Sequence, residues 1–496
     1  MLIPLPRFIL CLILGALMTL AYAPFNIFIL GLICPALLII SLDKTTPSQA
    51  FLNAYCFGLG LFGTGVYWLH ISINMFGGVT LVGSILVTAA LVAFISLYPA
   101  LVGFIARRWF SRNQAICIIL IIPALWVLAE WARSWVFTGF PWLNLAYSQS
   151  DTFLANLVPI VGAYGLSWLT MLLAALLASL YYNRGRSSLP ILVGITLICV
   201  TCLSLGEVDW TRQKQKQLST ALVQAAIPQE LKWLPEMREK SLELYMQLSA
   251  PHWGADLIVW PETAIPAYPE SVPGFINNME KLTRERQTLF LSGLPSRDQD
   301  SGNYYNSVMM LGEAEPQWYH KQHLVPFGEY LPLKPLLGRV LDFLQIPMSD
   351  FSKGKQEKPL LMAKDLAIGI SICYEDTFGE EVIGALPEAD ILVNVSNDAW
   401  FGDSLAPHQH LQMARMRALE SGRYLLRATN TGITAIIDEK GRILERSTQF
   451  KAEALSATVK LFQGATPYVL WGNLPVIFGS LLVLLVTAWF FRRANT

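Results

Sequence analysis

Residues 79–105 read VTLVGSILVTAALVAFISLYPALVGFI, and none of these side chains carries a charge. A helix needs about 20 apolar residues to cross the hydrocarbon core of a bilayer, so this run predicts a membrane span. By the same criterion, further spans are expected at about 8–23, 27–42, 51–70, 114–134, 157–181, 189–206 and 469–491. The sequence thus predicts an α-helical membrane bundle of eight spans.

The composition agrees with a membrane protein. Of the 496 residues, 53% are hydrophobic and only 15% are charged, whereas soluble domains have about 45–50% apolar and about 25% charged residues. The 36 basic and 36 acidic side chains cancel. Binding of nucleic acid needs a clustered basic surface, so no nucleic-acid partner is expected.

The apolar runs divide the chain into three parts. Seven expected spans lie in residues 1–206, and the eighth lies in residues 465–496, which end in a short cytoplasmic tail. Between them, residues 207–464 have the charge content of a water-soluble domain. We therefore expect a seven-span membrane domain, a soluble domain and a C-terminal membrane helix.

Basic residues in the short loops set the orientation, because such loops stay in the cytoplasm. If the N-terminus is cytoplasmic, every inner loop contains basic residues, and the only basic residue of the short outer loops is Arg133. The inner basic residues are Arg7, Lys44, Arg107, Arg108, Arg112, Arg184, Arg186, Arg492 and Arg493. Residues 207–464 are then expected outside the cytoplasm, which is the periplasm for the inner membrane of a bacterium with two membranes.

The first apolar run has an alternative interpretation. Arg7, the run itself and the sequence Ala21-Tyr22-Ala23 resemble a secretory signal with a cleavage site. Pro24 directly follows that site, so we favour an uncleaved span. Cleavage would leave residues 207–464 on the same side of the membrane.

Residues 207–464 alternate between short runs rich in Val, Ile and Leu and segments with helical periodicity. This alternation predicts an α/β sandwich, in which helices cover β-sheets. The predicted strands are 218–224, 256–260, 288–293, 307–311, 366–372, 390–395 and 434–438, and the predicted helices are 229–249, 272–284 and 409–421.

The seven cysteines differ in their surroundings. Six lie in apolar runs, where a thiol behaves as a small apolar group: Cys11, Cys34, Cys56, Cys117, Cys199 and Cys202. Cys373 alone lies in residues 207–464. Because cysteines outside the cytoplasm are usually paired, a single thiol there is either a buried core residue or a functional one.

Two polar clusters precede this cysteine in the soluble domain. The sequence WPET at 260–263 places Glu262 at the exit of a predicted strand, which suits a general base, although a single glutamate there is usually a solvated loop charge. The sequence HKQHLVPFGEY at 320–330 contains Lys321. A lysine can lower the pKa of a nearby thiol and stabilise an oxyanion.

The third cluster is ICYED at 372–376, at the end of the predicted strand 366–372. A nucleophile at the junction of a strand and a turn is exposed on a sharp bend, and the N–H groups after it can bind an oxyanion. This predicts Cys373 as the nucleophile and the N–H of Tyr374 as an oxyanion donor.

The histidines do not indicate a metal site. His408 and His410 are two residues apart, so a helix points them to different faces. No carboxylate or cysteine accompanies the histidines at a spacing typical of metal ligands. Neither a metal nor another cofactor is expected.

In this order, the three clusters resemble the motifs of the carbon–nitrogen hydrolase, or nitrilase, superfamily. The resemblance implies an αββα sandwich and a catalytic triad of Glu262, Lys321 and Cys373. The phrase HLVPFGEYLP at 323–332, together with the expected spans, is similar to one branch of this superfamily, the apolipoprotein N-acyltransferases. The resemblance covers nearly the whole chain, including the outer loop at 138–142.

The resemblance also implies the reaction, which completes lipoprotein maturation. An acyl chain would pass from a membrane phospholipid to Cys373 as a thioester, and then to the α-amino group of the N-terminal diacylglyceryl-cysteine of an apolipoprotein. This is a ping-pong mechanism. Glu262 would transfer the protons, while Lys321 and the N–H of Tyr374 would stabilise the oxyanion.

Further residues have roles that the resemblance implies. Glu329 would hold Lys321 in place, and Trp233, Tyr374, Glu375 and Trp400 match positions near the acyl or head-group pocket. Trp233 could equally be a core aromatic. The apolar loop 140–142 and the segment 341–351 would be lids over the site or interfacial anchors.

A membrane-tethered amidase and a transporter are the alternative functions. A membrane-tethered amidase could use the same triad on a small amide, but a single anchor would suffice for it. A transporter would carry charged residues along its path, and the spans contain only Glu130, near Arg133. No heptad repeat or second interface stands out, so a monomer is expected.

Overall fold

The structure is a computed structural model that describes residues 6–182, 188–298, 300–326, 328–330 and 351–493. These residues form two compact units. The helical unit contains residues up to 70, residues 81–209 and residues from 470 onward, and the sandwich unit contains residues 71–80 and 210–469. The domain boundaries expected near residues 206 and 464 stay a prediction.

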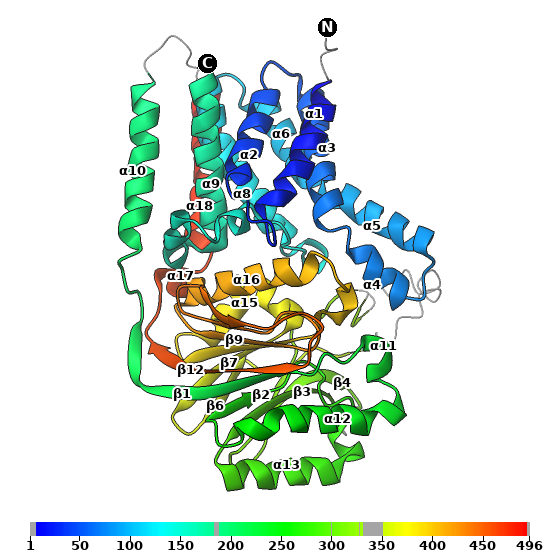
Figure 1. Cartoon of the computed structure of the whole chain (residues 1–496). Helices are drawn as coiled ribbons and strands as arrows, with labels where there is room; N and C mark the ends of the chain where they lie inside the picture. Colours follow the sequence, from blue (N-terminus) through cyan, green and yellow to red (C-terminus); the bar gives the residue numbers. More distant parts are fainter. Residues whose placement is uncertain (1–5, 183–187, 299, 327, 331–350, 494–496) are drawn as a thin grey trace. The chain divides into compact units, whose positions relative to one another are not determined.

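The helical unit consists mainly of apolar helices (Figure 1). They are α1 (Arg7–Met18), α2 (Leu30–Ser41), α3 (Pro47–Gly65), α5 (Leu81–Ile95), α6 (Leu97–Trp109), α7 (Gln114–Ile116), α8 (Ile122–Arg133), α9 (Val158–Tyr182), α10 (Leu189–Leu205) and α18 (Leu474–Arg493). Short helices α4 (Leu69–Met75) and α17 (Pro467–Trp471) lie at the changes from one unit to the other.

Among the described residues, four helices are long and apolar enough to cross a membrane, or five if one bent pair counts as a span. The four are Leu81–Trp109, Gln114–Arg133, Phe153–Tyr182 and Leu474–Arg493, and the bent pair is Pro47–Gly65 with Leu69–Met75. The expected count of eight spans is therefore not confirmed. The other expected spans correspond to shorter apolar helices, Arg7–Ala21, Leu30–Ser41 and Leu189–Leu205.

Two glycines let α1 and α3 pack backbone against backbone. A Cβ on Gly15 would overlap the main-chain oxygen of Phe57, and a Cβ on Gly60 would overlap that of Leu12. Small residues at such crossings allow close approach, on which the packing of apolar helices depends in the absence of water.

The charged pair on α8 fixes a loop and does not line a path. Glu130 accepts a hydrogen bond from the N–H of Leu145 at 2.7 Å, and Arg133 donates one to Asn144 Oδ1 at 2.6 Å. Arg133 also donates to the main-chain oxygen of Trp142, whose side chain is buried. Trp142 therefore belongs to the packed interior of the helical unit.

The sandwich unit contains two six-stranded sheets. The first has the order β12-β1-β2-β3-β4-β5, with β12 at Glu453–Gln463, β1 at Arg212–Gln224, β2 at Leu257–Val259, β3 at Leu289–Arg297, β4 at Tyr304–Leu311 and β5 at Gln317–His320. The second has the order β11-β10-β9-β8-β7-β6, with β11 at Ile443–Arg446, β10 at Ala435–Ile437, β9 at Leu425–Thr429, β8 at Ile391–Ser396, β7 at Leu366–Ile372 and β6 at Leu360–Ala363.

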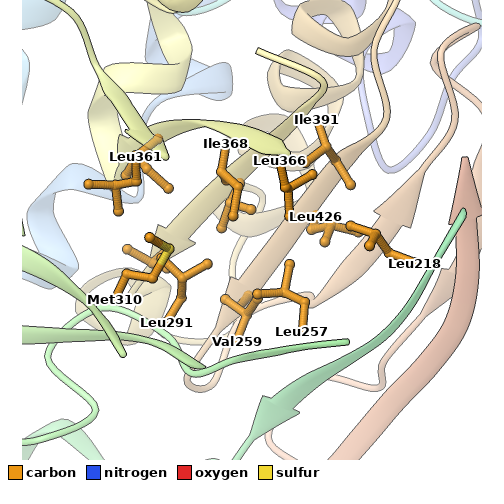
Figure 2. Packing of buried hydrophobic residues seen from close by; sticks show 14 of the residues in the cluster. Leu218, Leu257, Val259, Leu291, Met310, Leu361, Leu366, Ile368, Ile391 and Leu426 are labelled. Atoms are coloured by element: carbon orange, nitrogen blue, oxygen red, sulfur yellow. The ribbon is translucent and has the colours of Figure 1, made fainter. Parts of the chain in front are cut away.

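The inner faces of the two sheets share one apolar core (Figure 2). Leu257 and Leu291 of the first sheet and Ile368 and Leu426 of the second are among its fully or almost fully buried members. Burial of this area removes apolar surface from water, which is the main stabilising contribution to folding.

Helices cover both outer faces, which gives four layers (Figure 1). Helices α12 (Pro235–Ser249) and α13 (Pro273–Arg286) pack on the first sheet, and α15 (Gly379–Val382) and α16 (Ala406–Ser421) pack on the second. The helix predicted at 229–249 is two helices, α11 (Gln229–Lys232) and α12. Proline lacks a backbone N–H and suits the first helical position, so Pro235 starts a new helix and does not continue the old one.

The strand directions decide where a site can form. Strands β7, β8 and β9 run parallel, as do β1, β2 and β3. Active sites of such sheets lie beyond the carboxyl ends of the strands. The segments that follow β2, β7 and β8 contain Glu262, Cys373 and Trp400.

Candidate active site

Cys373 lies on the turn that directly follows β7. The 3-10 turn η8 (Cys373–Thr377) begins at this residue, and Cys373 has a positive φ of 50°. This left-handed conformation is strained for a residue with a Cβ, and such strain is typical of functional sites. Cys373 is half-buried, and like the other described cysteines it forms no disulfide.

Glu375, two residues later, ties this turn to the segment that contains Lys321. Its buried carboxylate accepts hydrogen bonds from the N–H groups of Ile372 at 2.7 Å, Gln322 at 2.6 Å and His323 at 3.1 Å. Tyr319 Oη also donates to it at 3.0 Å. Burial raises the pKa of Glu375 to about 7. Glu375 thus holds the lysine loop against the cysteine turn.

Lys321 is buried between two carboxylates. Its Nζ lies 2.9 Å from Glu329 Oε1 and 3.9 Å from Glu262 Oε1. Asn306 on β4 bridges the same two groups, because its Nδ2 lies 2.7 Å from Glu262 Oε1 and 2.9 Å from Glu329 Oε1. The structure therefore brings Glu262, Lys321 and Glu329 together, and adds an amide that the sequence did not indicate.

The pKa values connect this group to the thiol. Burial, and then the carboxylate of Glu262, raise the pKa of the Cys373 thiol, while Lys321 lowers it. Burial also raises the pKa of Glu262, although Lys321 opposes this. Burial lowers the pKa of Lys321, but Glu329 and Glu262 outweigh it, so the net pKa is raised. At neutral pH the thiol is protonated, the lysine is cationic and the glutamate is a stronger base than usual.

Lys232 fixes the turn that contains Glu262. It is buried on α11, and its Nζ donates to the main-chain oxygen of Glu262 at 3.0 Å and to Thr263 Oγ1 at 2.6 Å. Burial lowers the pKa of Lys232 to about 8, although Glu262 acts in the opposite direction. The next residue, Trp233, is 36% exposed, so it is not a fully buried core aromatic.

Trp400 lies on the turn η10 (Asp398–Phe401) after β8. Its ring packs edge-on against Phe76 at a centroid distance of 4.8 Å, and Phe76 belongs to the part of the sandwich unit contributed by residues 71–80. Asn397, just before the turn, donates a hydrogen bond to Gln229 on α11 at 2.7 Å. This hydrogen bond connects the segment that contains Trp400 with the segment that contains Trp233, and both tryptophans are predicted to bind substrate.

The segment 341–351 was predicted to be a lid or an anchor, and all of it except Phe351 lies outside the described residues. This includes Phe343, Leu344, Ile346, Pro347 and Met348. Phe351 donates its N–H to the main-chain oxygen of Glu329 at 3.1 Å. In the described part of the chain, no group of three or more His, Cys, Asp and Glu could hold a metal ion.

Comparisons with known proteins match both parts of the chain. Residues 14–176 match the model of the apolipoprotein N-acyltransferase N-terminal domain, and residues 219–465 match the model of carbon–nitrogen hydrolase. The apolipoprotein N-acyltransferase of Methylococcus capsulatus is 43% identical over 93% of this chain and 92% of its own length. Proteins of the same name from Nitrosomonas europaea and Vibrio cholerae are 42% and 39% identical, over 99% and 97% of this chain and 99% and 96% of their own lengths.

Proposed function

This chain belongs to the apolipoprotein N-acyltransferase family, and we propose that it transfers an acyl chain from a membrane phospholipid to the amino terminus of an apolipoprotein. The acceptor is the α-amino group of an N-terminal diacylglyceryl-cysteine. The observation that carries this proposal is the group of Glu262, Lys321 and Glu329, in which the charges of Glu262 and Lys321 act on the thiol of Cys373. The proposed reaction uses only side chains and main-chain groups of this chain.

In the first step, Cys373 takes the acyl chain. Glu262 accepts the thiol proton as Sγ attacks the ester carbonyl of the phospholipid. Lys321 and the N–H of Tyr374 stabilise the oxyanion that forms. When the oxyanion collapses, the ester C–O bond breaks, the lysophospholipid alkoxide takes the proton from Glu262, and the acyl group remains as a thioester.

In the second step, the acceptor amine takes the acyl chain. The neutral α-amino group attacks the thioester carbonyl, and Glu262 accepts a proton from the nitrogen. The same donors stabilise the second oxyanion. Its collapse breaks the C–S bond, the thiolate takes the proton back, and an amide is released. Because the first product leaves before the second substrate reacts, the kinetics are ping-pong.

A thiol with a raised pKa fits this sequence of steps. It needs a base to become a nucleophile, and Glu262 is more basic than an ordinary glutamate because of burial. The lysine between two carboxylates stays protonated, so it presents a positive charge to each oxyanion. Glu329 and Glu375 hold the lysine and its loop, and Trp233 and Trp400 bind the acyl or head-group part of the substrates.

We propose that the chain crosses the inner membrane of a bacterium eight times, with the sandwich unit in the periplasm. The basic residues at the ends of the apolar helices support this orientation. Both substrates are lipids, so an enzyme in the same bilayer meets them without having to extract them into water. We propose a monomer, with a phospholipid donor and an apolipoprotein acceptor as its partners.

Intact-mass analysis tests this proposal directly. Enzyme incubated with phospholipid alone should gain one acyl group that hydroxylamine removes, and Cys373→Ala should gain none. Cys199→Ala is the matched control, because this half-buried cysteine lies on α10, and it should keep the adduct. Adding a diacylglyceryl peptide with a free amine should discharge the adduct, and the same peptide with a blocked amine should not.

An adduct that persists in Cys373→Ala would overturn the assignment of the nucleophile. Release of free fatty acid or ammonia without any acylated peptide would favour an amidase. Family membership makes that second outcome the less expected one.

A further inference from the structure

A buried cluster of four ionisable side chains lies behind the turn of Cys373, and the proposed steps do not use it. It consists of His410 on α16, Arg427 on β9, Asp376 on η8 and Asp398 on η10. Their exposures are 2%, 0%, 0% and 1% in that order. Burial of charge costs several kcal/mol per ion unless partners compensate it, so this arrangement requires a structural or functional reason.

Within the cluster, each of the two basic side chains contacts both aspartates. His410 Nδ1 lies 2.9 Å from Asp398 Oδ1, and His410 Nε2 lies 2.8 Å from Asp376 Oδ1. Arg427 Nη1 lies 2.9 Å from Asp376 Oδ2, and its Nη2 lies 3.0 Å from Asp398 Oδ2. Each carboxylate therefore contacts the same two cations, one through each oxygen.

The charges of the cluster balance. Burial and Arg427 lower the pKa of His410, but the two carboxylates outweigh them and raise it to about 9. Burial raises the pKa of Asp398, but Arg427 and His410 more than offset this, so it lies below its usual range. With Arg427 always protonated, two positive and two negative charges face each other at neutral pH.

The two carboxylates belong to different turns of the active site. Asp376 is in the turn of Cys373 and Tyr374, and Asp398 begins the turn of Trp400. These turns follow the neighbouring parallel strands β7 and β8. A single imidazole and a single guanidinium therefore clamp both turns at once.

A polar row across the second sheet extends the cluster to the nucleophile itself. Ser371, Asn394 and Arg427 are paired in register on β7, β8 and β9. Arg427 Nη1 donates to Asn394 Oδ1 at 2.7 Å, and Asn394 Nδ2 lies 3.0 Å from Ser371 Oγ and 3.4 Å from the main-chain oxygen of Cys373. A strained residue keeps its conformation only where its surroundings over-determine it, and this row supplies such a constraint for Cys373.

We propose that these four residues are positioning residues that hold the turns of Cys373 and Trp400 as one unit. Loss of any one releases both turns, which lowers the rate of thioester formation and the rate of transfer to the acceptor together. The inference rests on the proposed function, since it assigns a task to residues that serve the same site. It adds that the turn of Cys373 and the turn of Trp400 are coupled to each other. Both turns are far from the Lys321 loop in the sequence.

His410→Gln tests the clamp, and His408→Gln is its matched control. Both histidines lie on α16, but His408 is half-exposed and makes no part of the cluster. Full-length enzyme in detergent is followed by hydrogen exchange of the backbone amides, by single-turnover thioester formation with phospholipid, and by discharge of isolated acyl-enzyme to a diacylglyceryl peptide.

His410→Gln should increase exchange in both turns, 373–377 and 398–401, and should slow both chemical steps by about 10–100-fold, as displacements of about 1 Å do. His408→Gln should leave the exchange and both rates within about twofold of the wild type, because His408 is not part of the cluster. A twofold change in rate corresponds to about 0.4 kcal/mol. Increased exchange confined to one turn, or wild-type rates in folded His410→Gln, would overturn the clamp.

A second matched pair covers the case in which His410→Gln does not fold. Arg427→Lys keeps the buried charge but loses the fork, so it should fold and still loosen both turns. Arg423→Lys alters an equally buried arginine whose hydrogen bonds go to main-chain oxygens such as those of Ala389 and Gly464, and it should not loosen them. Equal exchange in the two lysine variants would overturn the inference. Failure of the wild type to form a thioester would instead overturn the proposed function, because hydrogen exchange does not depend on the chemistry.

Discussion

Replacing Lys321 by Met separates the catalytic contribution proposed for this lysine from its contribution to stability. The lysine is 1% exposed and lies between the carboxylates of Glu329 and Glu262, at 2.9 Å and 3.9 Å. Met fills a similar volume without charge. The variant then has two neighbouring carboxylates, the buried Glu262 and the half-buried Glu329, that share Asn306 and have lost their cation.

Two typical magnitudes apply to this change, one for the buried ion pair and one for the proposed oxyanion donor. Breaking a buried ion pair by removing one partner costs roughly 3–5 kcal/mol, which for a domain of this class lowers Tm by about 6–20 °C. Loss of one oxyanion donor lowers the rate of acyl transfer by about 10²–10³-fold. Lys321→Met should therefore be less stable and should form the Cys373 thioester at least about 100-fold more slowly.

The double variant Lys321→Met with Glu329→Gln distinguishes the two effects. It removes one carboxylate together with the lysine, so the charge balance of the site returns, and Gln can still accept the hydrogen bond that Val325 donates at 2.8 Å. Tm should recover most of the loss, while thioester formation, measured by intact mass in a single turnover, should stay slow. Recovery of both the rate and Tm in the double variant would refute a direct role of the Lys321 charge in the chemistry. A rate within tenfold of the wild type in the single variant Lys321→Met would refute it as well.

Three further perturbations follow from the same geometry. Glu262→Gln should raise the rate of Cys373 alkylation by iodoacetamide at a fixed pH near 8, because the carboxylate raises the pKa of the thiol. The same variant should slow thioester formation by about 10²–10⁴-fold, because the base is lost. A fall in both rates would contradict this. Asn306→Leu removes a hydrogen bond that lowers the pKa of Glu262, so the acid limb of the pH profile of kcat/KM should move to higher pH, and an unmoved limb would exclude the bridge. Gly293→Ala would put a Cβ 2.6 Å from the Cα of Glu262, so it should displace this residue. The free energy lost in the rate of thioester formation should then exceed the free energy of unfolding lost, as judged from the rate and the Tm measured on one sample.

The apolar strands could be read from the sequence with more success than the polar ones. The run at 366–372 contains only apolar and small residues, and strand β7 has these same bounds. Strand β9 at Leu425–Thr429 escaped prediction because Arg427 stands at its centre, and an arginine usually marks the surface. It is buried here only because two carboxylates from distant turns meet it.

The same reasoning explains which residues of the proposed site the sequence indicated. Glu262, Lys321 and Cys373 stand in short motifs whose order is informative. Asn306 belongs to no such motif, because it lies in β4 one residue before the strand predicted at 307–311, and nothing in the sequence pointed to it. Lys232 reads as a solvated helix residue, and only the packing of α11 on the turn of Glu262 buries it.

The raised pKa of Cys373 also accounts for how a free thiol can persist in the oxidising compartment proposed for the sandwich unit. Oxidation and disulfide exchange both proceed through the thiolate, and burial together with Glu262 keeps that form scarce in the resting enzyme. The thiolate appears only while Glu262 holds its proton and an acyl carbonyl is present to be attacked. The electrostatics that make a base necessary for catalysis therefore also protect the nucleophile between turnovers. By the same argument, a variant that lowers the pKa of the thiol, such as Glu262→Gln, should be oxidised faster by hydrogen peroxide than the wild type.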